Sequence, residues 1–339
     1  MNEDILSDVL RRVRLRGALY FHVSGAHDWA AEAPSCREIA AAVMPGVEHV
    51  MEYHVVLSGS CWGGVVGGEP VRLQTGDLIL FPHGDPHVVS SAPGMRAAPD
   101  VAGYFERRKR TLPFTVHLDV RQVGVDGDER LESPESPTVT TLVCGFLGCD
   151  LRPFNPLIAS LPRLMHVPAQ SPHDWAMQCA RQAAAEALQP RPGGAAMLER
   201  LSEMTFIDAV RRYLAAMPEE SQGWLAGLRD RFVGRAMACM HDAPAEPWTV
   251  DELGQRVGLS RSALHERFAG IVGQTPMQYL ANWRIQVGAA LLRDTTATVA
   301  SVALEVGYQS EPAFARAFKR MVGRPPASWR RHVGAQPPA

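Results

Sequence analysis

The sequence predicts an α+β multidomain chain with a β-rich front half, a helical middle and an all-helical tail. Between residues 50 and 90, short apolar runs alternate with glycine-rich turns, as in a barrel or sandwich of short strands. From about residue 174, apolar residues recur at the spacing of an amphipathic helix. The last hundred residues contain an internal repeat. A length of 339 residues suits two or three domains.

The composition is that of an ordinary globular protein, with 46% hydrophobic and 21% charged residues. No apolar run reaches the ~18–20 residues of a membrane span. The acidic start "MNEDILSDVL" lacks the basic and apolar regions of a signal peptide. We therefore expect a cytoplasmic protein without membrane contact. Six scattered cysteines without a C-x-x-C pair argue against a structural zinc finger.

The β-rich part is best defined around "TGDLILFPHGDPHVV", residues 75–89. A Gly-Asp turn precedes an apolar strand, and a loop with two histidines follows it. The helical middle includes a stripe of apolar residues at a spacing of three or four, which favours a core-facing helix side. Its members are Leu198, Leu201, Met204, Ile207, Val210 and Leu214.

The repeat in the tail appears when the sequence is shifted by 50 residues. The matched pairs are Ser310 with Ser260, Phe314 with Leu264, Phe318 with Phe268, Gly323 with Gly273, Pro326 with Pro276 and Trp329 with Tyr279. Each copy is typical of a helix-turn-helix, with a turn glycine, a capping serine and buried apolar residues. In the first copy, Thr249 and Glu252 also form a capping-box pattern.

A third helix is predicted between the two copies, from Thr275-Pro276 to about Leu292, because proline is favoured at the first helical position. This connecting helix, ~25 Å long, would hold the second helices of the two copies about one DNA turn (~34 Å) apart. The net charge of −2 does not oppose DNA binding, since residues 236–339 hold 11 Arg and Lys against eight Asp and Glu, a local charge of +3.

These features resemble the double helix-turn-helix domain of AraC/XylS-type transcription regulators. The stretches that carry the resemblance are "WTVDELGQRVGLSRSALHERFAGIVGQTPMQYLANWRIQVGAALL" and "VGYQSEPAFARAFKRMVGRPPASWR". One departure is Gly288 in the connector, where a helix former is usual.

The resemblance implies two groups of DNA contacts. The residues expected to read bases are Ser262, His265, Glu266, Glu311, Ala315 and Arg316. The expected phosphate contacts are the amides of Ser260 and Ser310 and the side chains of Arg261, Lys319 and Arg320. Arg316 is the strongest candidate, because arginine binds guanine O6 and N7 with two hydrogen bonds. Since Pro312 and Ala315 offer only apolar contact, we expect the second recognition helix to position the protein more than it selects sequence.

The front half resembles the cupin-like β-barrel found fused to such regulators. By this resemblance His54 and His87 occupy the two cupin motif positions, with His83, Asp85 or Glu52 as a third ligand for Zn or Fe. The dense His-x-His pattern of catalytic cupins is absent, because position 52 is Glu. The alternative is that the histidines bind a small molecule or the rim of the barrel.

Some regulators of this type respond to oxidants, and Cys144 with Gly145 matches the Cys-Gly position of that group. Position 141, however, is Thr where a second cysteine would complete a dithiol. Cys144 is therefore a candidate redox residue rather than half of a predicted disulfide.

We expect a cupin-like sensor domain over residues 1–170, a helical linker or dimerisation region over 171–235 and the DNA-binding domain over 236–333. The predicted function is a one-component, sequence-specific transcription regulator, not an enzyme, that senses a small molecule, metal or oxidant. Expected partners are double-stranded promoter DNA, RNA polymerase, an effector and a second copy in a homodimer. The alternatives are a front half that serves only as a dimerisation scaffold, and a metal-dependent cupin enzyme. Effector, operator and direction of regulation are not encoded in any motif.

Overall fold

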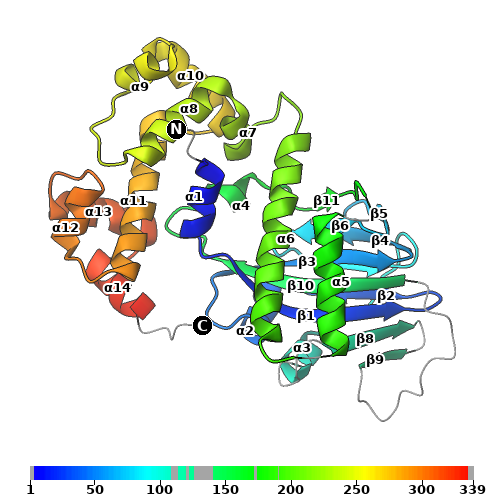
Figure 1. Ribbon diagram of the computed structural model, residues 1–339. Coiled ribbons are helices and arrows are strands. Elements are labelled where there is room, and N and C mark those ends of the chain that lie inside the picture. The colour runs from blue at the N-terminus through cyan, green and yellow to red at the C-terminus, as the bar shows by residue number, and fades with distance from the viewer. Residues whose placement is uncertain are drawn as a thin grey trace. The chain divides into compact units, whose positions relative to one another are not determined.

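The computed structural model describes residues 4–107, 114–119, 122–125, 140–171, 174–189 and 191–334. The chain forms two compact units, each assembled from segments distant in sequence. One consists of residues 15–149 and 161–216, and the other of residues 1–14, 150–160 and 217–339. The predicted α+β class is confirmed, since the described strands belong to the first unit and the second unit is helical (Figure 1).

The first unit is built on two sheets. Its described strands are β1 (Arg16–Gly25), β2 (Ala30–Ala33), β3 (His49–Ser58), β4 (Ser60–Val65), β5 (Val71–Gln74), β6 (Leu78–Phe81), β7 (His87–Ser90), β8 (Phe114–Asp119), β9 (Gln122–Val125), β10 (Thr140–Cys149) and β11 (Met165–Val167). The larger sheet has the order β11-β6-β3-β10-β1-β8-β9 and the smaller the order β2-β7-β4-β5. The β1–β8 pair is parallel and the other pairs are antiparallel.

The core of this unit lies between the two sheets, because both contribute buried side chains to one apolar cluster. The cluster includes Val23, Val56, Ile79, Phe81, Leu142 and Cys144 from the larger sheet, Cys61, Leu73 and Val89 from the smaller sheet, and Trp29 from a loop. Alternation along β3 directs Glu52, His54 and Val56 toward the same side of the sheet. Polar side chains on this side therefore enter an apolar environment.

Helices cover the other face of the larger sheet (Figure 1). They include α5 (Trp175–Leu188) and α6 (Gly194–Ala216), while α2 (Cys36–Val43) and α3 (Val101–Arg107) complete the helices of this unit. The hydroxyl of Tyr53 in β3 lies 3.0 Å from that of Ser202 in α6. Gly17 permits close approach, since a Cβ there would lie 2.3 Å from the Glu199 carbonyl oxygen.

The predicted apolar stripe of α6 is only partly correct. Met204 is 44% exposed, whereas Ser202 and Thr205 are buried. These small polar residues are accommodated because Ser202 bonds Tyr53 and Thr205 donates to the Leu201 carbonyl. Close packing against the sheet thus selects small residues that apolar spacing alone does not identify.

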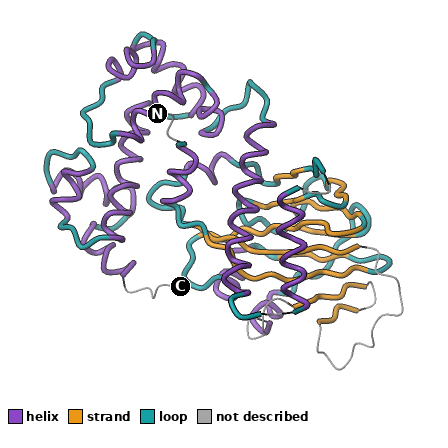
Figure 2. The backbone as a smooth tube through the Cα atoms, viewed as in Figure 1, coloured by secondary structure: helices purple, strands orange, loops and turns teal. Residues whose placement is uncertain are grey.

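The second unit contains α1 (Ile5–Arg12), α4 (Pro156–Ser160), α7 (Trp224–Arg229), α8 (Arg231–Asp242), α9 (Val250–Val257), α10 (Arg261–Val272), α11 (Pro276–Asp294), α12 (Val299–Glu305), α13 (Glu311–Val322) and α14 (Pro326–Gly334). The helix pairs α9–α10 and α12–α13 are the two predicted helix-turn-helix copies, and α11 connects them (Figure 2). No described helix combines the length and the apolar character needed to cross a membrane.

The predicted caps and turns of the repeat are confirmed. Thr249 and Glu252 form a capping box, and Ser260, Thr298 and Ser310 accept a hydrogen bond from the first turn of the helix that each precedes. Gly288 lies in the connector α11, where a helix former is usual, and packing explains the glycine. A Cβ at this position would lie 2.9 Å from the ring of Phe314 in α13.

Candidate functional site

The residues expected to read bases lie on the outer faces of α10 and α13. Ser262, His265 and Glu266 of α10 are exposed, as are Glu311 and Arg316 of α13, whereas Ala315 is half-buried. The opposite faces bury Leu264 and Phe268 in α10 and Phe314 and Phe318 in α13. The apolar faces thus anchor both helices and leave the predicted reading positions accessible to a ligand.

The positive charges differ between the two helices. In α10, Arg261 lies 3.5 Å from the Asp251 carboxylate, and Arg267 donates to Asp230 at 2.9–3.0 Å. In α13, the exposed side chains of Arg316, Lys319 and Arg320 have no acidic partner within 4 Å among the residues that the structure describes. The second helix therefore offers the larger set of uncompensated cations to a polyanion.

Both serines expected to contact phosphate are occupied as helix caps. Ser260 Oγ accepts from the Ala263 amide at 3.3 Å and Ser310 Oγ from the Ala313 amide at 3.4 Å. Their side chains thus fix where each recognition helix starts. Backbone amides at the same helix starts are the groups that suit a phosphate.

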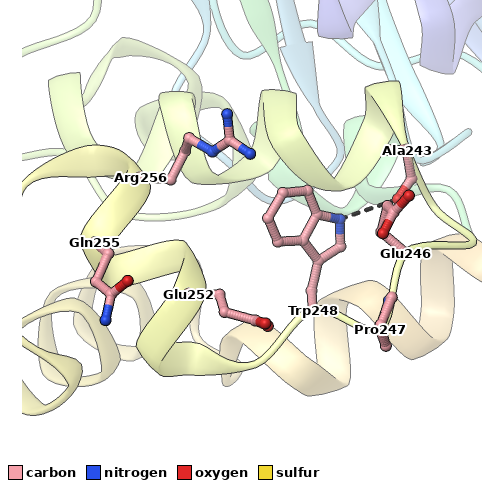
Figure 3. A pocket seen from close by; sticks show the side chains of 7 residues that line it. All are labelled: Ala243, Glu246, Pro247, Trp248, Glu252, Gln255 and Arg256. Atoms are coloured by element: carbon pink, nitrogen blue, oxygen red, sulfur yellow. Dashed lines mark hydrogen bonds between the residues drawn. The ribbon is translucent and has the colours of Figure 1, made fainter.

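A surface hollow of about 740 Å³ lies beside the first helix-turn-helix (Figure 3). Its lining residues are Ala243, Glu246, Pro247, Trp248, Glu252, Gln255 and Arg256. The Trp248 indole N–H donates to the Ala243 carbonyl at 3.0 Å, and Glu252 accepts from the Thr249 amide at 2.8 Å. These polar groups serve the junction between α8 and α9, and no residue predicted to bind DNA or effector lines the hollow.

A second candidate site is buried inside the two-sheet unit. The Nε2 atoms of His54 (β3) and His87 (β7) lie 2.9 Å apart. Glu52 Oε1 is 3.9 Å from His54 Nε2, and Glu52 Oε2 is 3.7 Å from His87 Nε2. The three side chains are at most 3% exposed and offer ligand atoms within 4.8 Å of one another. We call these three residues the buried centre.

Cys144 extends the buried centre from the neighbouring strand. In the β3–β10 register it is directly opposite His54, and its Sγ lies 2.8 Å from His54 Nδ1. On the other side, Phe81 stacks on the His87 ring with a centroid distance of 3.7 Å. The predicted redox residue and the predicted motif histidines thus belong to one contact network.

Burial shifts the pKa of every titratable group here toward its neutral form. It raises the pKa of Glu52 to about 8 and lowers that of His87 to about 4. Burial, together with the neighbouring His87, also lowers the pKa of His54, and burial raises the pKa of the Cys144 thiol. At neutral pH the Glu52–histidine contacts are therefore contacts between neutral groups rather than ion pairs.

The other candidate ligands of the front half lie elsewhere. The Nε2 atom of His83 is 2.9 Å from the Leu161 carbonyl oxygen, and the Asp85 carboxylate pairs with Arg163 at 2.6 Å. Only the backbone carbonyl of Asp85 reaches the buried centre, where it accepts from His87 Nδ1 at 3.0 Å. Of the possible third ligands, the structure brings Glu52 into contact with the two histidines. The sequence left the three alternatives open, although alternation along a strand that holds residues 52 and 54 would have favoured Glu52 over the loop residues.

A third polar cluster, in the helical unit, was not predicted. His241 of α8 lies between Asp8 of α1 (Nδ1–Oδ2, 2.9 Å) and Tyr279 of α11 (Nε2–Oη, 2.7 Å). The Trp224 indole N–H donates to the same Tyr279 oxygen at 2.9 Å. The His241 ring also stacks on Trp283 with a centroid distance of 3.7 Å. No motif marks this cluster, since its members come from four separate helical segments.

Comparison with known proteins connects these sites to a family. Residues 4–215 match the family model described as Cupin, and residues 253–332 match the one described as Helix-turn-helix domain. The chain is 33% identical to an AraC-like transcription regulator of Streptomyces lividans, over 97% of this chain and 98% of that protein. The chain belongs to the AraC family of transcription regulators.

One further relative and one solved structure are also similar to parts or all of the chain. The HTH-type transcriptional regulator AlkR of Acinetobacter baylyi is 25% identical over 96% of this chain and 99% of its own length. The solved DNA-binding domain of AdpA, in complex with a target DNA, is 28% identical and aligns with 32% of this chain and 97% of that one, with a TM-score of 0.31. The two family models and the curated relatives confirm the predicted family, its cupin domain and the non-enzymatic class.

Proposed function

We propose that this AraC-family regulator binds promoter DNA through α10 and α13 and that its cupin domain senses an effector at the buried centre. The assignment to the transcription regulators rests on the family to which the chain belongs. The proposed DNA contacts rest on the exposed positions of the two recognition helices. The observation that carries the sensor assignment is the polar group of Glu52, His54 and His87 within an apolar core. Buried polar groups of this kind are costly, so a ligand-binding role explains their presence.

Regulation would follow from a difference in effector affinity between two conformations of the chain that differ in DNA binding. As a regulator of this family, the protein would act in the cytoplasm and contact RNA polymerase at its promoters. Residues 171–235 would contribute the contacts of a homodimer. Met197 and Met204 of α6 support this, since both are more than 40% exposed on a helix whose other side packs on the sheet.

DNA recognition is tested by footprinting upstream of the regulator's own gene and of its neighbours. Two contacts per protomer about 10 base pairs apart are expected. Binding that is neither specific nor sensitive to salt would contradict the proposal.

Arg316→Ala separates base reading from positioning. The substitution is expected to cost about 1–3 kcal/mol on the footprinted site and to relax the preference at one base pair. Lys319→Ala is the matched control, expected to weaken binding to all sequences alike and to reduce the salt dependence. An equal loss on all sequences for Arg316→Ala would make this side chain a phosphate contact instead.

A front half that serves only as a scaffold is the remaining alternative. It predicts that no metal ion or small molecule raises the melting temperature of the purified regulator in a thermal-shift screen.

A further inference from the structure

The two helix-turn-helix copies have a second connection besides the helix α11. It is the segment between α8 and α9, residues 243–248, which we call the junction segment. The segment is a tight turn, because the Glu246 amide donates to the Ala243 carbonyl at 3.2 Å and the Trp248 amide donates to the Glu246 carbonyl at 2.7 Å. Its backbone is thus held by internal hydrogen bonds and can transmit the position of one neighbour to another.

The junction segment is attached to the first helix-turn-helix. It ends at Trp248, directly before Thr249, the N-cap of α9. Figure 3 shows Trp248 together with Arg256 of α9, whose guanidinium carbon lies 5.7 Å from the centroid of the indole ring. The Trp248 indole N–H donates back to the Ala243 carbonyl at 3.0 Å. A displacement of the segment would therefore displace α9 as well.

The same segment contacts the second helix-turn-helix at its turn. Gly307, between α12 and α13, has a φ of +84°, and a Cβ at this position would lie 2.7 Å from the Ala245 carbonyl oxygen. Glycine permits this approach because it adopts a positive φ without strain and has no side chain. The turn of the second copy therefore packs directly on the backbone of the junction segment.

Arg284 of α11 ties the junction segment to the connector. Its Nε donates to the Pro244 carbonyl and its Nη2 to the Glu246 carbonyl, both at 2.7 Å. We call this pair of hydrogen bonds the Arg284 bridge. Charged donors form short, strong hydrogen bonds, and two from one planar guanidinium fix orientation as well as distance. Arg284 also acts on Tyr308 of the second copy, where burial raises the pKa of the hydroxyl and the charge of Arg284 opposes this rise.

The separation of the two recognition helices decides which DNA sites both can reach. If α10 and α13 enter the major groove about one turn apart, one extra base pair moves one half-site by about 3.4 Å and rotates it by about 35°. Gly288, one turn after Arg284, weakens the connector α11 near its middle. A second contact that joins both copies would hold their separation against bending of this helix.

We propose that Arg284 is a positioning residue that, through the junction segment, sets the number of base pairs required between the two half-sites. This proposal rests on the proposed DNA contacts of α10 and α13 and adds a spacing specificity to them. Arg284 donates to protein carbonyls, so it contributes no contact to a base or a phosphate. The side chains of the recognition helices read the sequence, and the Arg284 bridge holds those helices at one separation.

The test measures the affinity of the full chain for the footprinted site and for the same site with one base pair added or removed between the half-sites. Fluorescence anisotropy of the wild type should show discrimination against both altered spacings by about 10-fold or more. Arg284→Met keeps an apolar stem but removes the bridge, and its discrimination should fall to about 3-fold or less. Arg284→Lys keeps the charge but cannot donate in the same fork, so it should also lose discrimination. It serves if Arg284→Met does not fold.

Arg330→Met is the matched control. Arg330 of α14 also donates to two backbone carbonyls, those of Leu292 at 2.9 Å and Ala297 at 2.5 Å, but both acceptors lie on the side of the second copy. This variant should lose stability in urea denaturation, as Arg284→Met does, and keep the wild-type discrimination between spacings. Wild-type discrimination in Arg284→Met or Arg284→Lys would overturn the proposal, and so would an equal loss of discrimination in Arg330→Met.

Salt dependence and footprints separate this proposal from the proposed function. Arg284→Met should leave the slope of log affinity against log salt unchanged, whereas a slope smaller by about one would make Arg284 a phosphate contact and overturn the bridge. Two footprinted contacts with wild-type spacing discrimination in every variant would remove the bridge and leave the DNA contacts of α10 and α13 standing. A wild type that contacts the footprinted site in one groove only would remove the proposed pair of contacts together with the bridge.

Discussion

The two buried histidine clusters have similar parts but differ in how completely their hydrogen bonds are satisfied. In the helical unit, Trp224 donates to Tyr279, Tyr279 to His241 and His241 to Asp8, so each of these four side chains has a partner, although the indole nitrogen of the stacked Trp283 has none among the described residues. In the buried centre, His54 and His87 are also hydrogen-bonded to each other, but Glu52 Oε2 has no donor among the described residues. The hydrogen-bonded network around His241 is typical of a structural role, whereas the unpartnered carboxyl oxygen of the buried centre is typical of a binding site.

The clusters also differ in charge. Burial raises the pKa of Asp8, but the hydrogen bond from His241 and the charge of Arg12 outweigh this, so that the net pKa lies below its ordinary value. In the buried centre no such partner opposes burial, and the pKa of Glu52 rises to about 8. The Asp8 carboxylate thus stays ionised because its partners stabilise the charge. The Glu52 carboxyl ionises only at the cost of desolvation or with a cation beside it.

The largest expected effect is on the pH dependence of stability. Between the ordinary pKa of 4.5 and the folded-state value of about 8, folded Glu52 binds a proton that the unfolded chain has lost. Raising the pH through this window should therefore remove up to roughly 3–5 kcal/mol of the Glu52 contribution to the free energy of unfolding, whereas the lowered pKa values of His54 and His87 act in the opposite direction below their ordinary value of 6.5. Urea denaturation of chelator-treated protein at pH 5, 6, 7 and 8 measures this slope.

The isosteric variant Glu52→Gln has no titrating group at this position, so its free energy of unfolding minus that of the wild type should rise as the pH is raised. Parallel pH profiles for the wild type and Glu52→Gln would show that the carboxyl is not held in its neutral form.

The next effect concerns the complete network. Tyr279→Phe leaves the Trp224 N–H and His241 Nε2 buried without a partner, and should lower the free energy of unfolding of this unit by about 1–3 kcal/mol. Tyr308→Phe, at a half-buried tyrosine outside the network, should change stability by less than about 0.5 kcal/mol. Urea denaturation followed by tryptophan fluorescence compares the two. A Tyr279→Phe variant as stable as Tyr308→Phe would mean that the network contributes little.

The smallest effect is expected at the rim of that network. Asp8→Asn keeps an acceptor for His241 but loses the charge, at a cost of about 1 kcal/mol at neutral pH. Because the folded-state pKa of Asp8 is depressed, its contribution is present above the ordinary value of 3.8 and is lost as the pH falls through the folded value. Denaturation at pH 7 and pH 3 should show a smaller difference from the wild type at pH 3 than at pH 7. A difference that persists unchanged at pH 3 would assign the effect to shape rather than charge.

The helical tail was the part most completely predictable from sequence. Its repeat depends on local rules, and the serine caps, the capping box at Thr249 and the buried Phe314 all follow from neighbours within four residues. The buried centre was predictable in part. His54 and His87 were found by resemblance, but the choice of Glu52 over Asp85 depends on which side of β3 and of the β6–β7 loop each side chain occupies.

Other features depend on contacts between distant segments and left no local signal. Asp8 and His241 are 233 residues apart. Ser202 and Thr205 look like interruptions of the apolar stripe of α6 until Tyr53 and the close approach at Gly17 are known. The contact between His54 and Cys144 likewise depends on the register of β3 against β10.

We propose that ligand binding at the buried centre changes DNA affinity, and fluorescence anisotropy on the footprinted DNA, with Zn(II) as the probe ligand, tests this most directly. The affinity of chelator-treated wild type is compared with that of Zn(II)-restored wild type, at fixed salt, alongside Glu52→Gln under both conditions. A change of about 5-fold or more in the wild type, with none in Glu52→Gln, is the predicted result. Equal affinity of the wild type with and without Zn(II) would contradict the account.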